Sequence, residues 1–168
     1  MEGYLLDTNA VAHWYEQHPK LAARVNDLDA EAQVRVSVIT LGELEFGHNV
    51  SLEGRDLDLR DAFAKWVDKT FPRPRTLDVT RHTRDCYGKV RAAIFDKYPP
   101  LGGTENHPEK CYDRVSAVEL GIDENDLWIA AQAMEHGLIL ITQDNMERIK
   151  ELSQSACDFP LQYQDWTV

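Results

Sequence analysis

The sequence predicts a single α/β domain over residues 1–168, with a mostly parallel sheet of about five strands and helices on both of its faces. Short apolar runs alternate with amphipathic stretches along the chain, which is the pattern of parallel strands connected through helices. The 168 residues are 43% hydrophobic, enough for one core and too few for two comfortable domains. Two apolar runs, at residues 4–6 and 138–141, stop abruptly in polar side chains, as strands do where a sheet opens into a ligand crevice.

Each element is predicted by its own hydrophobic pattern and by the residues at its ends. Continuous apolar or β-branched runs predict buried strands, and stripes at intervals of three and four residues predict helices that proline or glycine ends. In chain order, the expected elements are a strand at 4–6, helices at 11–18 and 21–28, a strand at 34–39, helices at 40–47 and 59–67, a strand at 76–79, helices at 80–98 and 123–136, a strand at 138–141, a helix at 146–152 and an edge strand at 161–163.

Residues 99–122 show little periodicity, so we expect a long loop or insertion there. His107 and Cys111 lie within it, but no second pair accompanies them to complete a metal site. With Cys86 and Cys157 the cysteines are odd in number and widely spaced, which predicts neither a disulfide framework nor a cysteine zinc site.

The charge balance argues against a protein that holds nucleic acid by bulk electrostatics, because the net charge is −11. Residues 69–97 are the exception, with eight Lys and Arg against three Asp. In the helix expected at 80–98, Arg81, Arg84 and Arg91 lie on one flank, either as a strip that contacts phosphates or as a solvated helix face. No apolar run is long enough for a membrane span and no signal segment precedes the first strand, so we expect a cytoplasmic protein.

Four acids are expected near one edge of the sheet. Asp7 and Asp144 follow strands, and Glu43 and Asp126 lie in the first turns of helices that leave the same edge. Each has a simpler structural interpretation, since Asp7 can cap the following helix, and Thr40 with Glu43 forms the pattern of a capping box.

Acids gathered in this way repel one another unless a cation neutralises them. Mg²⁺ or Mn²⁺ suits such a site, because both are hard ions that take carboxylate oxygens and keep several water molecules. A bound metal lowers the pKa of a water molecule and stabilises charge on a scissile phosphate, so the pattern favours phosphoryl chemistry. Glu45 and Glu124 are further acids that can join the cluster.

Four motifs in this order resemble a PIN domain, and within that family the chain is most similar to the VapC-type toxin ribonucleases. The motifs are residues 5–9 (LLDTN), residues 39–44 (ITLGEL) with Gly47, residues 125–131 (NDLWIAA) and residues 136–144 (HGLILITQD). Residues 161–166 are similar to the closing strand of that family.

The resemblance implies a metal-dependent endoribonuclease whose parallel sheet has the order 3-2-1-4-5. Its acids correspond to Asp7, Glu43, Asp126 and Asp144, of which the first and the last two would hold Mg²⁺ or Mn²⁺. Asn9 and Thr142 match the supporting polar positions of the family. The resemblance further implies an RNA substrate, a cognate antitoxin and a homodimer. The first helices carry several aromatic side chains that can either form a surface for such partners or pack in the core. They are Trp14, Tyr15, Phe46, Phe63 and Trp66.

Two features depart from the compact toxins of this family: the long stretch at 99–122 and the strongly acidic balance. A haloacid-dehalogenase-like phosphatase needs a second Asp where Asn9 stands, and a receiver domain needs a Lys at a later strand end that the chain lacks. The remaining alternative is a catalytically silent PIN-like module that binds RNA or protein. No Walker loop or G-x-G-x-x-G motif supports nucleotide binding.

Overall fold

The computed structural model describes residues 3–29, 31–50, 57–103 and 106–168. The chain divides into two compact units. The first unit contains Met1–Asp78, Ile139–Gln143 and Tyr163–Val168, and the second contains Val79–Leu138 and Asp144–Gln162. No helix among the described residues has both the length and the apolar character that crossing a membrane requires.

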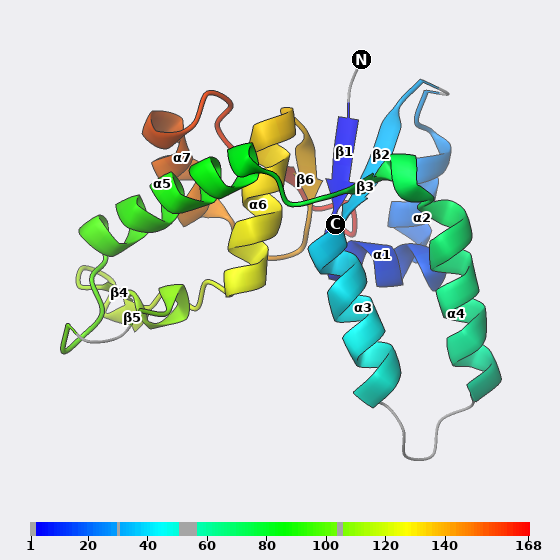
Figure 1. The fold of residues 1–168 in the computed structure, drawn as a ribbon, viewed down its shortest axis with the longest axis horizontal. Helices are drawn as coiled ribbons and strands as arrows, with labels where there is room; N and C mark the ends of the chain where they lie inside the picture. The colour runs from blue at the N-terminus through cyan, green and yellow to red at the C-terminus, as the bar shows by residue number, and fades with distance from the viewer. Residues whose placement is uncertain (1–2, 30, 51–56, 104–105) are drawn as a thin grey trace. The chain divides into compact units, whose positions relative to one another are not determined.

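A five-stranded sheet of order β3-β2-β1-β6-β7 confirms the predicted α/β fold (Figure 1). Strand β1 pairs in parallel with β2 on one side and β6 on the other, and β2 pairs in parallel with β3. The predicted order 3-2-1-4-5 differs in detail, because β4 and β5 form a separate two-stranded sheet. The strands are β1 (Gly3–Leu6), β2 (Gln33–Ser37), β3 (Thr76–Leu77), β4 (Tyr112–Asp113), β5 (Val118–Glu119), β6 (Ile139–Ile141) and β7 (Gln162–Gln164).

Seven α-helices occur in the described part of the chain. Two short 3-10 helices, η1 (Arg73–Arg75) and η2 (Pro108–Lys110), accompany them. The α-helices are α1 (Thr8–Tyr15), α2 (Pro19–Asn26), α3 (Val38–Val50), α4 (Leu57–Thr70), α5 (Arg81–Lys97), α6 (Glu124–His136) and α7 (Glu147–Ala156).

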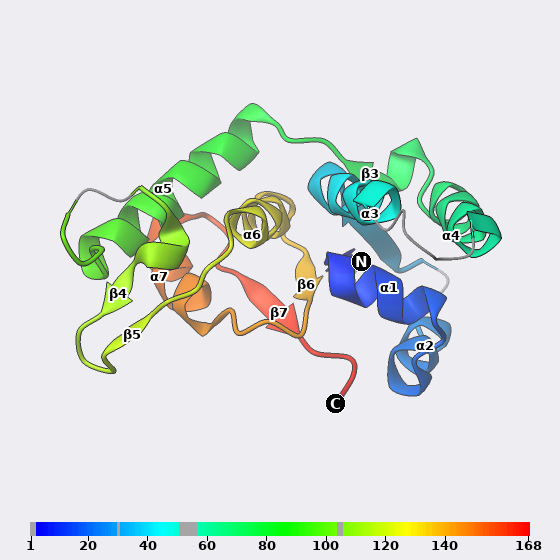
Figure 2. The ribbon, with the colours of Figure 1, turned by 90° about the horizontal axis from the view of Figure 1, so that it is seen from below.

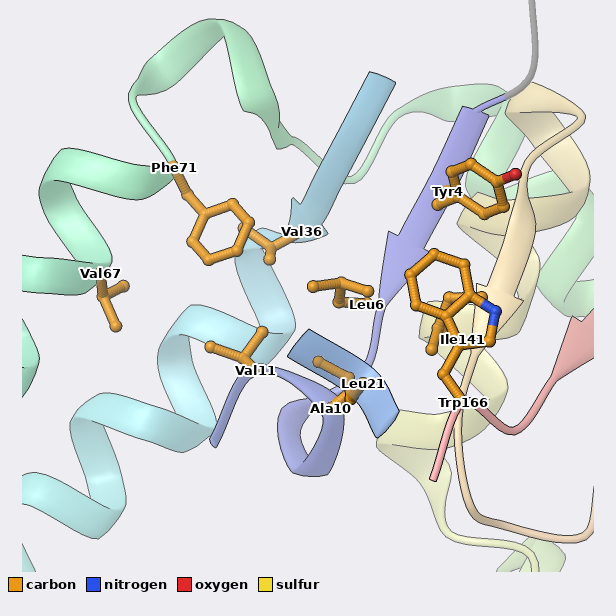
Figure 3. Packing of buried hydrophobic residues seen from close by; sticks show 10 residues of the cluster. All are labelled: Tyr4, Leu6, Ala10, Val11, Leu21, Val36, Val67, Phe71, Ile141 and Trp166. Carbon is orange, nitrogen blue, oxygen red and sulfur yellow. The ribbon is translucent and has the colours of Figure 1, made fainter. Parts of the chain in front are cut away.

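The core of the first unit forms around strand β1 (Figure 3). Leu6 on β1, Val36 on β2 and Ile141 on β6 meet side chains from the first helices, and Trp166 packs edge-on against Tyr4. Burial of large apolar side chains stabilises this arrangement by roughly 1.5–3 kcal/mol for each fully buried side chain. The same packing fixes the carboxyl ends of β1, β2 and β6, where the polar residues of interest begin.

Most of the early aromatic side chains serve core packing. Trp14 and Tyr15 on α1 contact Trp66 on α4 edge-on or tilted, and Phe63 stacks on Trp66. Phe46 on α3 differs, because 68% of its surface is exposed.

The boundary between β2 and α3 differs from the prediction. Val38 and Ile39 were predicted to continue the strand because they are β-branched, but both lie in the first turn of α3. The Ser37 hydroxyl accepts a hydrogen bond from the Ile39 backbone N–H at 2.9 Å, which ends the strand and begins the helix. The capping box of Thr40 and Glu43 is therefore wrong, since Thr40 is fully buried within the helix.

In the second unit α5 packs against α6 and α7 (Figure 2). The starts of α5 and α6 agree with the residues predicted from the sequence. Thr80 caps α5 in a reciprocal pair of hydrogen bonds with Thr83. Asp123 caps α6, and its carboxylate accepts a hydrogen bond from the Asn125 N–H at 2.7 Å. Gly137 ends α6 in the left-handed conformation, with φ of 60°.

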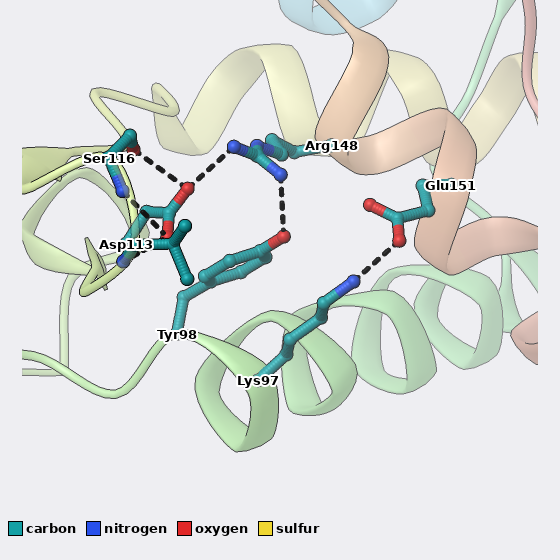
Figure 4. A network of polar contacts seen from close by, with 7 residues as sticks. Lys97, Tyr98, Asp113, Ser116, Arg148 and Glu151 are labelled. Carbon is teal, nitrogen blue, oxygen red and sulfur yellow. Dashed lines mark hydrogen bonds and ion pairs between the residues drawn. The ribbon is translucent and has the colours of Figure 1, made fainter.

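Residues 99–122 are more regular than the predicted loop, although residues 104 and 105 lie outside the described residues. They contain η2 and the β4–β5 hairpin, which a polar network ties to the helices of the second unit (Figure 4). The Asp113 carboxylate accepts hydrogen bonds from Ser116 at 2.8 Å and from Arg148 on α7 at 2.6 Å. Arg148 also donates to the Tyr98 hydroxyl at 2.8 Å, so one side chain holds the hairpin and the end of α5 together.

Candidate active site

Asp7 begins the candidate site at the carboxyl end of β1. Its backbone N–H donates to the Ile141 carbonyl of the neighbouring strand at 3.1 Å, which continues the ladder by one residue. One carboxylate oxygen accepts the Ala10 N–H at 2.6 Å, so Asp7 is the N-cap of α1. The residue is only 4% exposed. A carboxyl group is thus held by a backbone N–H at the end of a buried strand.

Glu43 is connected to the same corner through Thr8. The Thr8 hydroxyl, on the residue after Asp7, donates to a carboxylate oxygen of Glu43 on α3. This contact joins two positions that lie 35 residues apart in the chain. Because Ser37 caps α3, the Glu43 side chain has no capping role there. The structure therefore brings together Asp7, Thr8 and Glu43 within the first unit.

Thr142 lies beside Asp7 at the same edge of the sheet. Leu6 and Ile141 are register partners in β1 and β6, so the residues that follow them, Asp7 and Thr142, leave adjacent strands at the same level. The Thr142 N–H donates to the Gln164 carbonyl at 3.0 Å, and the residue is almost fully buried. Asn9, the other supporting residue predicted, is exposed in the first turn of α1.

The other two predicted acids belong to the second unit. Asp126 lies in the first turn of α6, where its charge is favourable to the helix dipole, and it is partly buried. Asp144 is exposed and follows Thr142 by two positions in the chain. The convergence of all four acids on one centre therefore stays a prediction.

The chemistry of these donors fits a hard divalent cation. Carboxylates, hydroxyls and an amide supply oxygen ligands, whereas soft thiolate ligands are absent from the predicted set. Within residues 3–29, 31–50, 57–103 and 106–168, however, no group of three His, Cys, Asp or Glu side chains is placed so that it could hold a metal ion. The types of donor thus fit a metal site, whereas the placement of the acids around one ion stays a prediction.

Glu45 and Glu124, the further acids named from sequence, have other contacts. Glu45 accepts a hydrogen bond from Asn49 one turn along α3, at 2.9 Å. Glu124 receives the Tyr87 hydroxyl and pairs with Arg91 at 3.0 Å. Burial raises the pKa of the Glu124 carboxyl, while the adjacent Arg91 guanidinium favours its charged form. These contacts account for both side chains without a role in the acid cluster.

The predicted arginine strip is largely paired with acids. Arg84 contacts its neighbour Asp85 at 2.6 Å, with both side chains more than half exposed. Arg91 forms an ion pair with Glu124 and donates a hydrogen bond to the Asn106 carbonyl. Arg81 is exposed at the start of α5. The net positive charge that α5 offers to a phosphate chain is therefore smaller than its sequence suggests.

Two residues of this corner were not singled out for these roles from the sequence. Ser37 lies between a β-branched strand and a helical stripe, and it caps α3. Because serine is a preferred N-cap residue, its position in the sequence could have predicted this role. Thr8 was named only as part of a motif. Its contact with Glu43 crosses two elements, and no local pattern predicts such a pair.

Comparisons with known proteins agree with this fold and its motifs. The chain is 27% identical to Ribonuclease VapC1 of Haemophilus influenzae (strain R2866) over 169 residues, which cover 98% of each protein. Two structures share the fold at lower identity. VapBC2 from Rickettsia felis, bound to a DNA fragment from its promoter, has a TM-score of 0.68 at 19% identity, with 98% of each chain covered. VapBC-1 from nontypeable Haemophilus influenzae has a TM-score of 0.66 at 24% identity, with 99% of each chain covered.

The PIN-domain profile matches residues 4–152, from β1 through most of α7. That match spans nearly all of the chain and contains every acid predicted for the site. The chain belongs to the PIN-domain family.

Proposed function

We propose that this protein is a metal-dependent endoribonuclease that hydrolyses phosphodiester bonds of RNA in the cytoplasm, as the toxin of a toxin–antitoxin pair. The observation that carries the proposal is the corner formed by Asp7, Thr8 and Glu43 at the carboxyl end of β1. The similarity to a protein named Ribonuclease VapC1 supports the reaction class. The solved VapBC complexes with the same fold support a partner protein of the antitoxin type.

In this proposal Asp7, Asp126 and Asp144 hold Mg²⁺, with Mn²⁺ as an alternative, and Glu43 acts beside them. A divalent ion at such a site supplies a water molecule of lowered pKa and stabilises charge on the scissile phosphate. Asp7 contributes a carboxylate that the Ala10 N–H holds in a fixed orientation. Thr8 orients Glu43, and Asn9 and Thr142 provide polar support at the same edge of the sheet. The flank of Arg81, Arg84 and Arg91 contacts the RNA backbone weakly, because Arg84 and Arg91 are already paired with acids.

The exposed part of α3 is the surface we propose for a protein partner, in the antitoxin complex or in a homodimer. Phe46 and Val50 are one turn apart on α3 and are 68% and 60% exposed. A cavity of about 360 Å³ also lies between α3 and α4, and its lining contains Leu41 and Phe63 together with the polar Glu45, His48 and Asp68. Exposed apolar surface of this kind favours a binding partner. Light scattering after size exclusion tests the homodimer, and a monomer at every concentration would contradict it.

The test of the reaction is cleavage of a mixed panel of structured and single-stranded RNAs, with Mg²⁺, with Mn²⁺ and with EDTA. We expect cleavage with either metal and none with EDTA. Asp7→Asn should remove cleavage while leaving the fold intact, because it removes a charge but keeps the shape of the side chain. The matched control is Asp96→Asn, which removes one exposed charge on α5.

Equal cleavage by wild type and Asp7→Asn would contradict the proposed nuclease. RNA binding without cleavage would instead favour a catalytically silent PIN-like module. Filter binding of the same RNA panel distinguishes these outcomes.

A further inference from the structure

Two cysteines that are far apart in the sequence lie together in the second unit. Cys86 is on α5 and Cys157 is the C-cap of α7, 71 positions later. The Cys157 thiol points at the Cys86 backbone carbonyl, with 3.9 Å between sulfur and oxygen. The side chains of Cys157 and Cys86 also interact electrostatically. Because α5 and α7 pack closely along their lengths, the structure itself holds this pair in place.

A cavity opens onto both thiols. Its volume is about 330 Å³, and Cys86 and Cys157 are each only partly buried. This space admits a molecule as small as hydrogen peroxide. The other lining residues with titratable side chains are His82, Asp85, Lys89, Glu135, His136 and Asp158. Although several of these are ligand types, no such group among the described residues is placed to hold a metal ion. The cavity therefore favours chemistry at the two sulfurs over metal binding.

We propose that Cys86 and Cys157 are a redox modification site at which a hydroperoxide forms an intramolecular disulfide. The Cys86 thiol loses its proton to solvent and the thiolate attacks a peroxide oxygen, so that the O–O bond breaks and the leaving hydroxide takes up a proton from solvent. The products are a sulfenic acid on Cys86 and one water molecule. The Cys157 sulfur then attacks the Cys86 sulfur and displaces a second water molecule as the S–S bond forms. Two thiols are oxidised and one peroxide is reduced, so atoms and electrons balance.

The environment of the two sulfurs assigns these roles. Burial and the neighbouring Cys86 side chain raise the pKa of the Cys157 thiol to about 12, so this thiol stays protonated and reacts slowly with an oxidant. Cys157 is therefore the residue that resolves an oxidised neighbour. The third cysteine, Cys111, is fully buried, and burial raises the pKa of its thiol as well. Cys111 serves as the internal control that peroxide leaves reduced.

The bond would join the first helix of the second unit, α5, to the end of its last helix, α7. A disulfide that closes a long loop restricts the unfolded chain, so the oxidised protein should melt at a higher temperature than the reduced protein. The inference is independent of the proposed nuclease function, because both sulfurs lie outside the residues assigned to that site.

The experiment treats the reduced full-length protein with hydrogen peroxide and measures intact mass, free thiols after denaturation and melting temperature. We expect a monomer that has lost two hydrogen atoms, one remaining thiol out of three, and a tryptic fragment that joins Cys86 to Cys157. The melting temperature should rise and return to its original value with dithiothreitol. The matched variant Cys111→Ser should behave in the same way, with no thiol remaining.

Variants of the pair test the assigned roles. In Cys157→Ser no disulfide forms, and dimedone should trap the sulfenic acid on Cys86. In Cys86→Ser the remaining thiols should react slowly. A mass gain of oxygen without a disulfide in wild type, covalent dimers between chains, or three unreacted thiols at a peroxide dose that oxidises the unfolded chain would each overturn the proposal. The wild-type peptide map decides the question even if a variant fails to fold.

Discussion

At the scale of single residues, the contact between Thr8 and Glu43 is the most informative one in the candidate site. Thr8 positions Glu43 without being one of the proposed metal ligands. Thr8→Val keeps the size of the side chain but removes the donor, so Glu43 loses its hydrogen bond with Thr8. Residues that orient a metal-site carboxylate typically matter by about 10–100-fold, and we expect kcat for RNA cleavage to fall by roughly that factor with little change in KM.

Thr8→Ser is the matched control for this prediction, because it restores the hydroxyl on a smaller side chain. It should recover most of the activity that Thr8→Val loses. If valine and serine variants were equally active, Thr8 would be a packing residue with no part in positioning Glu43.

Asp113 makes a pH-dependent contribution to stability. Hydrogen bonds from the Ser116 hydroxyl and the Val115 N–H, together with the Arg148 guanidinium, lower the pKa of its carboxyl in the folded protein. A lowered folded pKa stabilises the protein at pH values above the unfolded pKa, about 3.9 for Asp, and this contribution is lost as the pH falls further. Asp113→Asn should therefore melt below wild type at pH 7, and the difference should shrink on acidification.

Melting curves by circular dichroism between pH 7 and pH 3 check this prediction, with the exposed Asp96→Asn on α5 as the control of equal charge. A difference between Asp113→Asn and wild type that stayed constant over this range would show that ionisation of Asp113 contributes nothing.

At the scale of elements, the end of α6 offers a test of local backbone conformation. Gly137 has φ of 60°, and an added Cβ would meet only the Phe159 ring at 3.8 Å, an ordinary contact. The cost of Gly137→Ala is therefore backbone strain, and we expect a loss of about 1 kcal/mol in the free energy of unfolding. Gly88→Ala, in the exposed middle of α5, should instead gain about 0.5–1 kcal/mol.

Urea unfolding followed by circular dichroism measures both glycine variants. Changes of the same sign would contradict the assignment of a left-handed cap at Gly137. The opposite signs are expected because one position needs glycine for its conformation and the other merely tolerates it.

The elements also show which features a sequence can predict. The ends of α5 and α6 were predictable because Thr80 and Asp123 cap through local contacts. The start of α3 was not, because Val38 and Ile39 carry strand propensity that the Ser37 cap overrides. The β4–β5 hairpin has strands of two residues, too short for any periodic pattern, and Arg148 of a distant helix holds it.

At the scale of the whole molecule, the predicted acids divide between the two units of the chain. The residues alone placed Asp7 and Thr142 at strand ends on a common edge, and the resemblance, through the order 3-2-1-4-5, made their strands neighbours. The parallel pairing of β1 with β6 agrees with that order. The contact between Thr8 and Glu43 needed the structure, since it depends on how α3 leaves the sheet. Asp126 and Asp144 belong to the second unit, so their joint role with Asp7 stays a proposal.

The proposed metal site predicts that melting of the chain is sensitive to divalent ions. A ligand that binds only the folded protein stabilises it by about 2.7 kcal/mol at 100 times its dissociation constant. We therefore expect Mg²⁺ or Mn²⁺ to raise the melting temperature of wild type, and EDTA to reverse the shift. Asp7→Asn and Asp144→Asn should each abolish most of it although they lie in different units, whereas Asp96→Asn should retain it. A full shift in Asp144→Asn would remove Asp144 from the proposed ligands.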